Sequence, residues 1–259
     1  MIDRRLSPED DQFRRQYYGS GRHTLMIIRF DSRNDTIPHL MVQSATARLF
    51  EEVNISGTKN LLKCIYEHRG VRMLIYTSST GIIHNGYTDI LNATEDVPIF
   101  PNHPEYYGLN ARSGTKEEAE VIFRKANRKH GLLTCILRCP TLYGEADNTT
   151  IPQIVGNAQA GRGNMQIGDG ENMFDYLYLG NAAYAHRLAA NKLLRLMWRH
   201  HHLPRMEGSM VGSLSSQTKF WDFVKAVGTA AGCGVIRENV KVVPTWLYYA
   251  MAVIAKWSV

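Results

Sequence analysis

Two short apolar runs with helical patterns around them constrain the fold more than any other feature of this sequence. Residues 73–78 and 132–137 have the length and composition of buried strands, and residues 25–30 form a third such run. Apolar residues recur at helical spacing from residue 45 to about residue 68, and another helix is expected before the last run. Strands that alternate with helices imply right-handed crossovers, so we predict an α/β, Rossmann-like fold with a mostly parallel sheet and flanking helices.

Composition and charge exclude several classes of protein. With 259 residues and 44% hydrophobic content, the chain can bury one large core, or a main core with a smaller lobe, so a disordered protein is excluded. The net charge of +6 suits an anionic ligand, but the basic residues form no long stripe, so we expect no nucleic-acid partner. We expect no metal site, because residues 199–202 end a helical pattern and the four cysteines lack a C-x-x-C spacing.

The two ends of the chain bear on its surroundings. The first residues lack the apolar region of a signal peptide, and no apolar run is long enough to span a bilayer. Residues 244–255 are apolar nearly all round, and Pro244 suits the first turn of a helix. We therefore expect a reducing, cytoplasmic compartment and a membrane-surface contact through residues 244–259.

Several separated segments together carry a family resemblance. Residues 53–62 (VNISGTKNLL), 74–80 (LIYTSST) and 115–120 (TKEEAE), followed by 137–144 (LRCPTLYG), resemble extended short-chain dehydrogenases in that order. Residues 167–186 (IGDGENMFDYLYLGNAAYAH) narrow the match. They resemble the substrate-lobe signature of the 3β-hydroxysteroid dehydrogenase/isomerase family and of sterol-4α-carboxylate 3-dehydrogenases.

This resemblance, which covers roughly residues 49–190, implies an activity. The family oxidises the 3β-hydroxyl of a steroid or sterol with NAD or NADP, and the cytoplasmic face of the endoplasmic reticulum membrane is an expected location. The hydride passes to the nicotinamide, while a serine orients the substrate oxygen, a tyrosine exchanges the proton and a lysine lowers the pKa of that phenol. The sequence is compatible with a homodimer but does not determine the oligomeric state.

Ser79 and Lys116 match the family serine and lysine. Ser79 follows a predicted strand, where ligands bind in α/β sheets. Each residue also has a simpler reading, because hydroxyls often form turns at strand ends and Lys116 could be a solvated lysine in a first helical turn. The resemblance further implies the cofactor-binding residues Asn54, Ser78, Lys116, Arg138 and Pro140, and the substrate-binding residues Gly168, Asn172 and Tyr178.

The family tyrosine is disturbed in this sequence. It is expected one helical turn before the lysine, where this chain has Arg112, and an arginine cannot exchange a proton at neutral pH. Residues 102–107 (NHPEYY) also resemble the stretch that runs into the family tyrosine. Tyr107 is therefore the candidate proton carrier, with residues 108–112 as an insertion, and Tyr106 is a poorer candidate.

A proton carrier at Tyr107 requires a particular start for the next helix. On one continuous helix, the nine positions from Tyr107 to Lys116 turn through about 900° and rise roughly 13 Å, which puts the two side chains on opposite faces. A helix that begins at Thr115, with Glu118 completing a capping box, would leave residues 108–114 as a loop. Catalysis through Tyr107 therefore predicts a helix start at Thr115.

The glycine-rich turn of a dinucleotide fold is missing near the start of the chain. Such a turn lets backbone N–H groups approach a pyrophosphate, but Gly19-Ser-Gly21 lacks a third glycine and no buried strand precedes it. We therefore predict a divergent or truncated part over residues 1–45. The Rossmann-like core, over residues 46–150, is then N-terminally incomplete.

The pattern changes beyond residue 150. Helices are expected from about Asn181 and Thr218, and an apolar helix is expected at the end. Glycine-rich loops are predicted around Gly156, Gly161, Gly163, Gly168 and Gly170. This pattern predicts a small C-terminal substrate lobe over residues 151–259.

Two other functions stay open. A nucleotide-sugar epimerase or dehydratase shares the Ser, Tyr and Lys groups, but the signature at residues 167–186 and the apolar end favour the sterol reading. The alternative from another class is a catalytically inactive or truncated paralogue that acts as a binding protein. Soluble expression with measurable NAD(P)H binding separates the enzyme from the inactive product.

Overall fold

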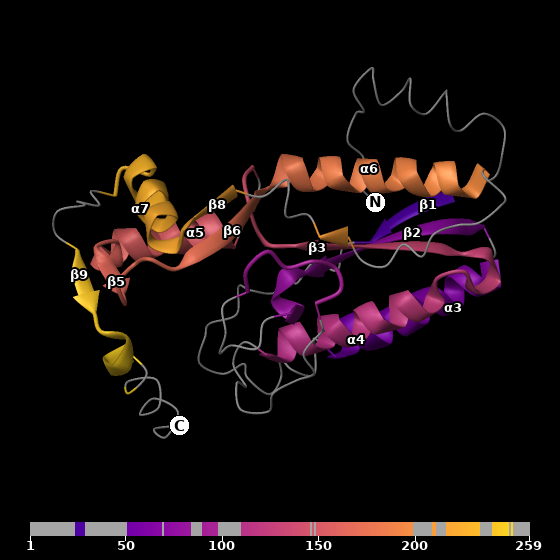
Figure 1. The fold of residues 1–259 in the computed structure, drawn as a ribbon, viewed down its shortest axis with the longest axis horizontal. Helices are drawn as coiled ribbons and strands as arrows, with labels where there is room; N and C mark the ends of the chain where they lie inside the picture. Colours follow the sequence, from indigo (N-terminus) through magenta and orange to yellow (C-terminus); the bar gives the residue numbers. More distant parts are fainter. Residues whose placement is uncertain are drawn as a thin grey trace, which may run out of the picture.

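The computed structural model describes residues 24–28, 51–68, 70–83, 90–97, 110–145, 147, 149–198, 209–210, 216–233, 240–248 and 250. In this part of the chain, a parallel core sheet with helices on both faces lies beside a smaller lobe (Figure 1). The predicted α/β, Rossmann-like fold is confirmed.

The core sheet has the strand order β1-β2-β3-β7, and every pair in it is parallel. Its strands are β1 (Thr24–Ile28), β2 (Val71–Ser79), β3 (Leu133–Cys139) and β7 (Ser209–Met210). Side chains on both faces of β2 and β3 are buried, which explains why these strands appear in the sequence as continuous apolar runs. Because the strands are parallel, their carboxyl ends meet at one edge of the sheet.

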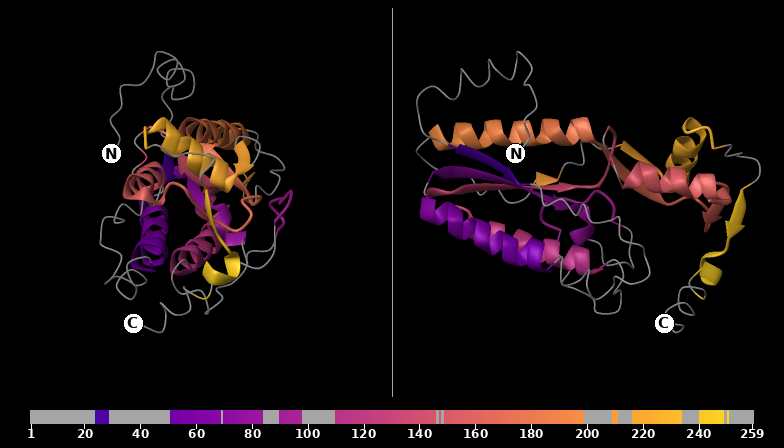
Figure 2. Two further views of the ribbon diagram at one scale, coloured as in Figure 1. Left: turned by 90° about the vertical axis from the view of Figure 1, so that its left-hand side faces the viewer. Right: turned by 180° about the vertical axis from the view of Figure 1, so that it is seen from behind.

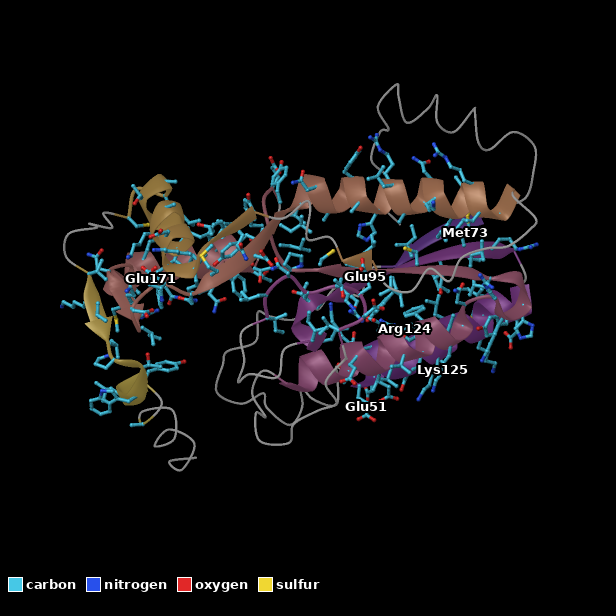
Figure 3. All side chains as sticks on the ribbon, in the orientation of Figure 1. Glu51, Met73, Glu95, Arg124, Lys125 and Glu171 are labelled. Atoms are coloured by element: carbon cyan, nitrogen blue, oxygen red, sulfur yellow. The ribbon has the colours of Figure 1, made fainter. Side chains whose placement is uncertain are left out.

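Helices cover both faces of the core sheet. They are α6 (Leu179–Trp198), α3 (Gly57–His68) and α4 (Asn110–Ala126). α6 lies on one face, and α3 and α4 lie on the other (Figures 1 and 2). The alternation of side chains along β2 sends Met73 and Ile75 toward α6 (Figure 3), and Leu74 and Tyr76 toward α3 and α4.

α4 begins at Asn110, so the prediction of a helix start at Thr115 is wrong. The Thr115 hydroxyl accepts a hydrogen bond from Asn54 Nδ2 at 2.9 Å, and α4 packs against η1 (Glu51–Ser56) and η2 (Thr80–Ile83). A hydroxyl engaged with another helix is not a dedicated N-cap, and packing against a neighbour stabilises turns that lie before it. Tertiary contacts therefore override the capping pattern of the sequence.

The helix predicted to end at about residue 68 is present within the described residues as two pieces. A π-helical turn, η1, precedes the α-helix α3 without a break. The Thr58 hydroxyl donates a hydrogen bond to the Asn54 carbonyl at 2.5 Å, across the junction of η1 and α3. A short 3₁₀ turn, η3 (Lys129–Gly131), follows α4 and leads into β3.

The lobe has a mixed sheet of order β4-β6-β8 and a separate parallel pair of strands, β5 and β9. Its strands are β4 (Thr141–Tyr143), β5 (Met165–Ile167), β6 (Met173–Tyr178), β8 (Ser216–Lys219) and β9 (Lys241–Val243), and its helices are α5 (Thr150–Asn157), η4 (Ala158–Arg162) and α7 (Phe220–Ala230). The loop predicted around Gly156 is wrong, because this residue lies in α5, whereas Gly161 has a left-handed φ of +75° that interrupts η4. Glycine can adopt many backbone conformations, and it also occurs within helices at a cost in conformational entropy.

Aromatic side chains fill the centre of the lobe. The ring of Tyr176 stacks on Phe223 at 3.7 Å, and Tyr143 meets Phe223 edge-on at 5.3 Å. Phe174 lies between Tyr176 and Phe220. Large rings compensate for a sheet with short strands, because each buries much apolar area per residue.

The core and the lobe are joined by two direct connections. Pro140 is the one residue between β3 and β4, and no residue separates β6 from α6. The position of the lobe therefore depends on how β3 and α6 pack in the core. In the described ranges, no helix is both long and apolar enough to cross a bilayer.

Candidate functional site

The carboxyl ends of β2 and β3 bring four of the residues of interest to one edge of the core sheet. In the parallel register Ser78 is paired with Arg138, and Ser79 is paired with Cys139. Pro140 follows directly and is buried. Ligands of α/β folds bind at this edge, which makes it the candidate site.

Ser78 presents a buried hydroxyl without a hydrogen-bond partner among the described residues. Its side chain is 2% exposed, and strand alternation places it on the same face as Tyr76, toward α3 and α4. A buried hydroxyl without a partner costs free energy, and a polar group of a ligand would remove that cost.

Ser79 forms a turn at the end of β2. Its Oγ accepts a hydrogen bond from the backbone N–H of Gly81 at 3.1 Å and so opens η2. Ser79 therefore forms the turn at the strand end that was the simpler interpretation of this residue. A hydroxyl that accepts one hydrogen bond can still donate its own hydrogen, so the turn is compatible with the catalytic role of Ser79, which stays a prediction.

Lys116 lies in the N-terminal half of α4 and is partly exposed. Its neighbour Thr115 is held by the Asn54 side chain, which is itself 4% exposed. η1 and α4 are thereby locked together directly beside the lysine. Asn54, predicted to bind the cofactor, thus has a structural contact through its Nδ2 atom.

Glu120 anchors α4 one turn after Lys116. Arg138 donates to Glu120 Oε1 through Nε at 3.2 Å and through Nη2 at 2.9 Å, and both side chains are fully buried. Arg124, on α4 (Figure 3), donates to the same oxygen at 2.8 Å. The described contacts of Arg138 therefore tie β3 to α4. Its Nη1 has no partner in the described residues.

Sequence reasoning missed Glu120. The signal was present, because Glu120 falls on the apolar face of α4 between Ala119 and Phe123, which are both fully buried. A carboxylate on such a face needs a cationic partner.

Burial and the neighbouring Glu120 carboxylate both raise the pKa of the Tyr76 phenol, and burial raises the pKa of the Cys135 thiol to about 11, so neither side chain ionises at neutral pH.

Tyr178 stands at the end of β6, paired with Tyr143 at the end of β4. Its hydroxyl donates to both Glu145 oxygens, at 2.8 and 2.6 Å, and this hydrogen bond raises the pKa of the Tyr178 phenol. The ring fits between two glycines. A Cβ at Gly144 would lie 2.8 Å from Tyr178 Cε2, and a Cβ at Gly180 would lie 2.5 Å from Cε1.

Replacement of Gly180 by alanine is expected to displace the Tyr178 ring. We expect the melting temperature to fall by roughly 3–8 °C, because a Cβ this close to the ring forces Tyr178 away from its place beside Glu145 and Gly144. Gly156→Ala is the matched control, since a Cβ there meets nothing within 4 Å and alanine favours a helix. Differential scanning calorimetry of both variants checks this, and an unchanged Gly180→Ala would contradict the packing.

Gly168 and Asn172 shape the loop between β5 and β6. The Gly168 N–H donates to the Val243 carbonyl at 3.0 Å, and its φ of +72° suits glycine. The Asn172 carbonyl accepts from the Phe220 N–H at 3.0 Å. These contacts support the lobe, and the substrate contacts expected of both residues stay predictions.

Arg112 lies within α4, one helical turn before Lys116. The backbone of α4 therefore places an arginine at the position expected for the family tyrosine. Residues 110–112 are helical, so the part of the insertion that was predicted to loop out there is wrong. Tyr107 and Tyr106 lie outside the described residues.

A shallow groove of about 430 Å³ runs between α3 and α4 and includes Leu62, Tyr66 and Ile122. None of the candidate site residues lines it. The described ranges hold no group of three or more His, Cys, Asp or Glu side chains that could bind a metal ion.

A parallel sheet with helices on both faces, polar residues at its carboxyl edge and an appended lobe define a short-chain dehydrogenase type of fold. A dTDP-glucose 4,6-dehydratase from Streptomyces venezuelae, solved with NAD and TYD bound, matches with a TM-score of 0.59 and 22% identity over 80% of this chain and 58% of that chain. A UDP-galactose 4-epimerase matches with a TM-score of 0.58 and 17% identity over 80% of this chain and 62% of that chain.

The chain belongs to the 3-beta hydroxysteroid dehydrogenase/isomerase family, because residues 36–234 match that family. It is 34% identical over 197 residues to 3beta-hydroxysteroid-dehydrogenase/decarboxylase isoform 1 of Arabidopsis thaliana, covering 73% of this chain and 41% of the relative. It is 38% identical over 170 residues to a decarboxylating sterol-4-alpha-carboxylate 3-dehydrogenase of Candida albicans, covering 63% and 47%. The chain thus spans about half the length of these relatives.

Proposed function

We propose that this chain binds NAD or NADP together with a 3β-hydroxysteroid or sterol at the carboxyl edge of the core sheet, and oxidises the 3β-hydroxyl. Family membership supports the reaction class. The observation that carries the proposal is the double anchoring of α4 on either side of Lys116. The Asn54 bond precedes the lysine, and the Glu120–Arg138 pair follows it.

Several residues at this edge fit a dinucleotide. The nicotinamide ribose would be bound by the Ser78 hydroxyl, which has no partner among the described residues, by the Lys116 ammonium and by the backbone around Pro140. Asn54 and Arg138 support this site through their contacts with α4. Bound there, the nicotinamide would supply the acceptor for the substrate hydride. A glycine-rich turn for the pyrophosphate is not found in the described ranges.

The residues of the chain have separate roles in the proposed reaction. Ser79 donates a hydrogen bond to the substrate oxygen and so orients the carbon that loses hydride. The Lys116 ammonium lowers the pKa of a neighbouring phenol, so that its phenolate form takes the hydroxyl proton. We propose Tyr107 for that phenol; because α4 begins at Asn110, this assignment requires the chain to turn within residues 108 and 109 and not within the longer loop expected from the sequence.

In this proposal the lobe, which follows the carboxyl end of β3 after Pro140 alone, supplies the sterol-binding side of the site. Tyr178 is held by Glu145 and by two glycines, so its ring presents a rigid edge at the end of β6. Gly168 and Asn172 shape the neighbouring loop. A flat apolar sterol suits a lobe whose centre is aromatic.

Lys116→Met tests the assignment of the lysine. We expect the rate of NAD(P)H formation from a 3β-hydroxysterol to fall at least about 100-fold, because the phenol loses its cationic neighbour. Lys125→Met is the control, since Lys125 is exposed in the last turn of the same helix. Equal rates for the two variants, measured by absorbance at the nicotinamide band, would remove Lys116 from the mechanism.

A second function is favoured by one observation. α4 carries Arg112 at the helical position of the family tyrosine, which suits a paralogue that binds ligands without turning them over. That binding protein would take up NAD(P)H and sterol with Lys116 and Ser79 in place. Absence of turnover together with saturable binding of both ligands identifies it.

We also propose that the end of the lobe contacts a membrane surface, on the cytoplasmic face of the endoplasmic reticulum. The supporting residues follow or belong to β9, and they are exposed: Val242 by 56%, Trp246 by 70% and Tyr248 by 48%. Aromatic rings suit the interface of a bilayer, where one end is apolar and the other is wet.

Trp246→Ala tests this membrane contact. We expect the fraction of protein that floats with liposomes of neutral and anionic phospholipid to fall about threefold or more, because the indole contributes much of the apolar area. Leu91→Ala is the control, since Leu91 is 76% exposed but lies in the core part of the chain. Equal flotation of the two variants would contradict the contact.

A further inference from the structure

The first part of α6 meets the core sheet through small side chains, and the larger Leu193 and Leu194 join the same apolar cluster farther along the helix. Ala182, Ala185, Ala189 and Ala190 are all buried, and they pack against the apolar residues of β2 and β3. α6 runs along the length of the sheet (Figure 1). Alanines form shallow ridges that interdigitate little, so they define the register of a helix on a sheet only weakly.

A polar bridge crosses this apolar contact. His186 Nε2 lies 2.7 Å from Thr77 Oγ1, and His186 Nδ1 lies 2.7 Å from the Ala182 carbonyl. A carbonyl only accepts, so Nδ1 carries the hydrogen and donates to it. In the neutral ring Nε2 then accepts from the Thr77 hydroxyl. Both ring nitrogens are therefore used, and the orientation of the imidazole is set.

Such a bridge selects one register. Thr77 is 8% exposed, so a hydroxyl moved away from its partner would be left buried and unsatisfied. A single polar pair in an apolar contact fixes alignment in coiled coils for the same reason. Sliding α6 along the sheet would therefore leave this hydroxyl unsatisfied, in the part of the helix where the surrounding alanines resist the movement least.

The bond between His186 and Thr77 connects the catalytic edge of the core sheet, at Ser79, with the substrate lobe, at Tyr178. Thr77 lies two residues before Ser79 on the same face of β2. His186 is the eighth residue of α6, which continues directly from Tyr178 at the end of β6, about 12 Å along the helix axis. Fixing α6 on β2 thus also fixes the distance from the lobe to the serine.

We propose that His186 is a positioning residue, which holds the substrate lobe in register with Ser79 through its bond to Thr77. Its effect on turnover rests on the proposed function, while its effect on the register does not. A misplacement of about 1 Å between substrate-binding and reacting groups is enough to lower a rate about 100-fold.

Two pairs of variants test the bridge. Thr77→Val and His186→Met keep the volume and remove the hydrogen bond. Thr77→Ser and His186→Gln retain it, because a Gln amide reaches the place of Nε2. We expect His186→Met to lower kcat for 3β-hydroxyl oxidation at least about tenfold, with the KM for the dinucleotide changed less than twofold, and His186→Gln to restore most of the loss.

Hydrogen exchange supplies a readout that needs no activity. We expect amide exchange in β6, Met173–Tyr178, and in the turn at Gly81 to quicken about tenfold in His186→Met and in Thr77→Val. His186→Gln and Thr77→Ser should resemble the wild type. A role confined to local packing would quicken exchange in α6 alone.

The outcomes separate the two proposals. If the wild-type chain oxidises no sterol but β6 loses protection in His186→Met and regains it in His186→Gln, the proposed function fails and the positioning role stands. If protection of β6 and kcat are the same in all four variants, or if His186→Gln is no better than His186→Met, the positioning role is refuted whatever the activity.

Discussion

Arg112→Tyr is expected to raise the rate of 3β-hydroxyl oxidation at least about 100-fold over the wild type. α4 begins at Asn110, so positions 112 and 116 lie one turn apart on one face of a regular helix. A phenol at position 112 would then stand beside the Lys116 ammonium, which lowers its pKa and makes it a competent acid and base. Positioned proton transfer contributes about 100- to 10,000-fold to a rate, and arginine supplies none of it.

Two further variants make this result specific. Arg112→Phe removes the charge but adds no hydroxyl, and it should show no comparable gain. Tyr107→Phe is expected to abolish the residual turnover of the wild type while leaving Arg112→Tyr active. NAD(P)H formation from a 3β-hydroxysterol is measured for the wild type, the three single variants and the double variant of Tyr107→Phe with Arg112→Tyr. An equal gain in Arg112→Phe would mean that charge, not proton transfer, limits the reaction, and full activity in Tyr107→Phe would remove Tyr107 as the proton carrier.

Glu120→Gln is expected to lower the free energy of unfolding by about 3–5 kcal/mol. The substitution keeps the shape of the side chain but leaves the fully buried Arg138 guanidinium without a compensating charge. Removing one partner of a buried ion pair costs about that much, because the remaining charge stays desolvated. The cost is large against the total stability of a domain.

Urea denaturation followed by far-ultraviolet circular dichroism checks this prediction. Glu67→Gln is the control, because Glu67 pairs with Lys63 at 4.0 Å on the exposed surface of α3, and such pairs contribute less than about 0.5 kcal/mol. The double variant Glu120→Leu with Arg138→Met removes both charges, and it should be milder than Glu120→Gln. Similar costs for Glu120→Gln and Glu67→Gln would show that the pair does not anchor α4.

The strands of the core could be predicted from the sequence because both of their faces are buried. Burial on two faces makes residues 73–78 and 132–137 continuous apolar runs, and β2 and β3 contain nearly all of both. The strands of the lobe were missed. β4 and β5 have three residues each, which is too short for an alternating pattern to show.

The details of the site depend on contacts between distant residues. The Thr115 hydroxyl, expected from the sequence to cap a helix, instead bonds Asn54, which is 61 residues away, and α4 begins at Asn110. His186 could be recognised as part of a family signature, but its partner Thr77 is 109 residues away. Local patterns report capping and amphipathic faces, whereas pairings over such separations depend on the assembled sheet.

Calorimetric titration of NADH into the folded chain tests most directly whether the carboxyl edge of the core sheet is a dinucleotide site. The proposed function predicts saturable binding that weakens at least about tenfold in Lys116→Met and stays the same in Lys125→Met. The absence of binding heat at any NADH concentration up to the millimolar range, from a sample that unfolds cooperatively, would contradict it.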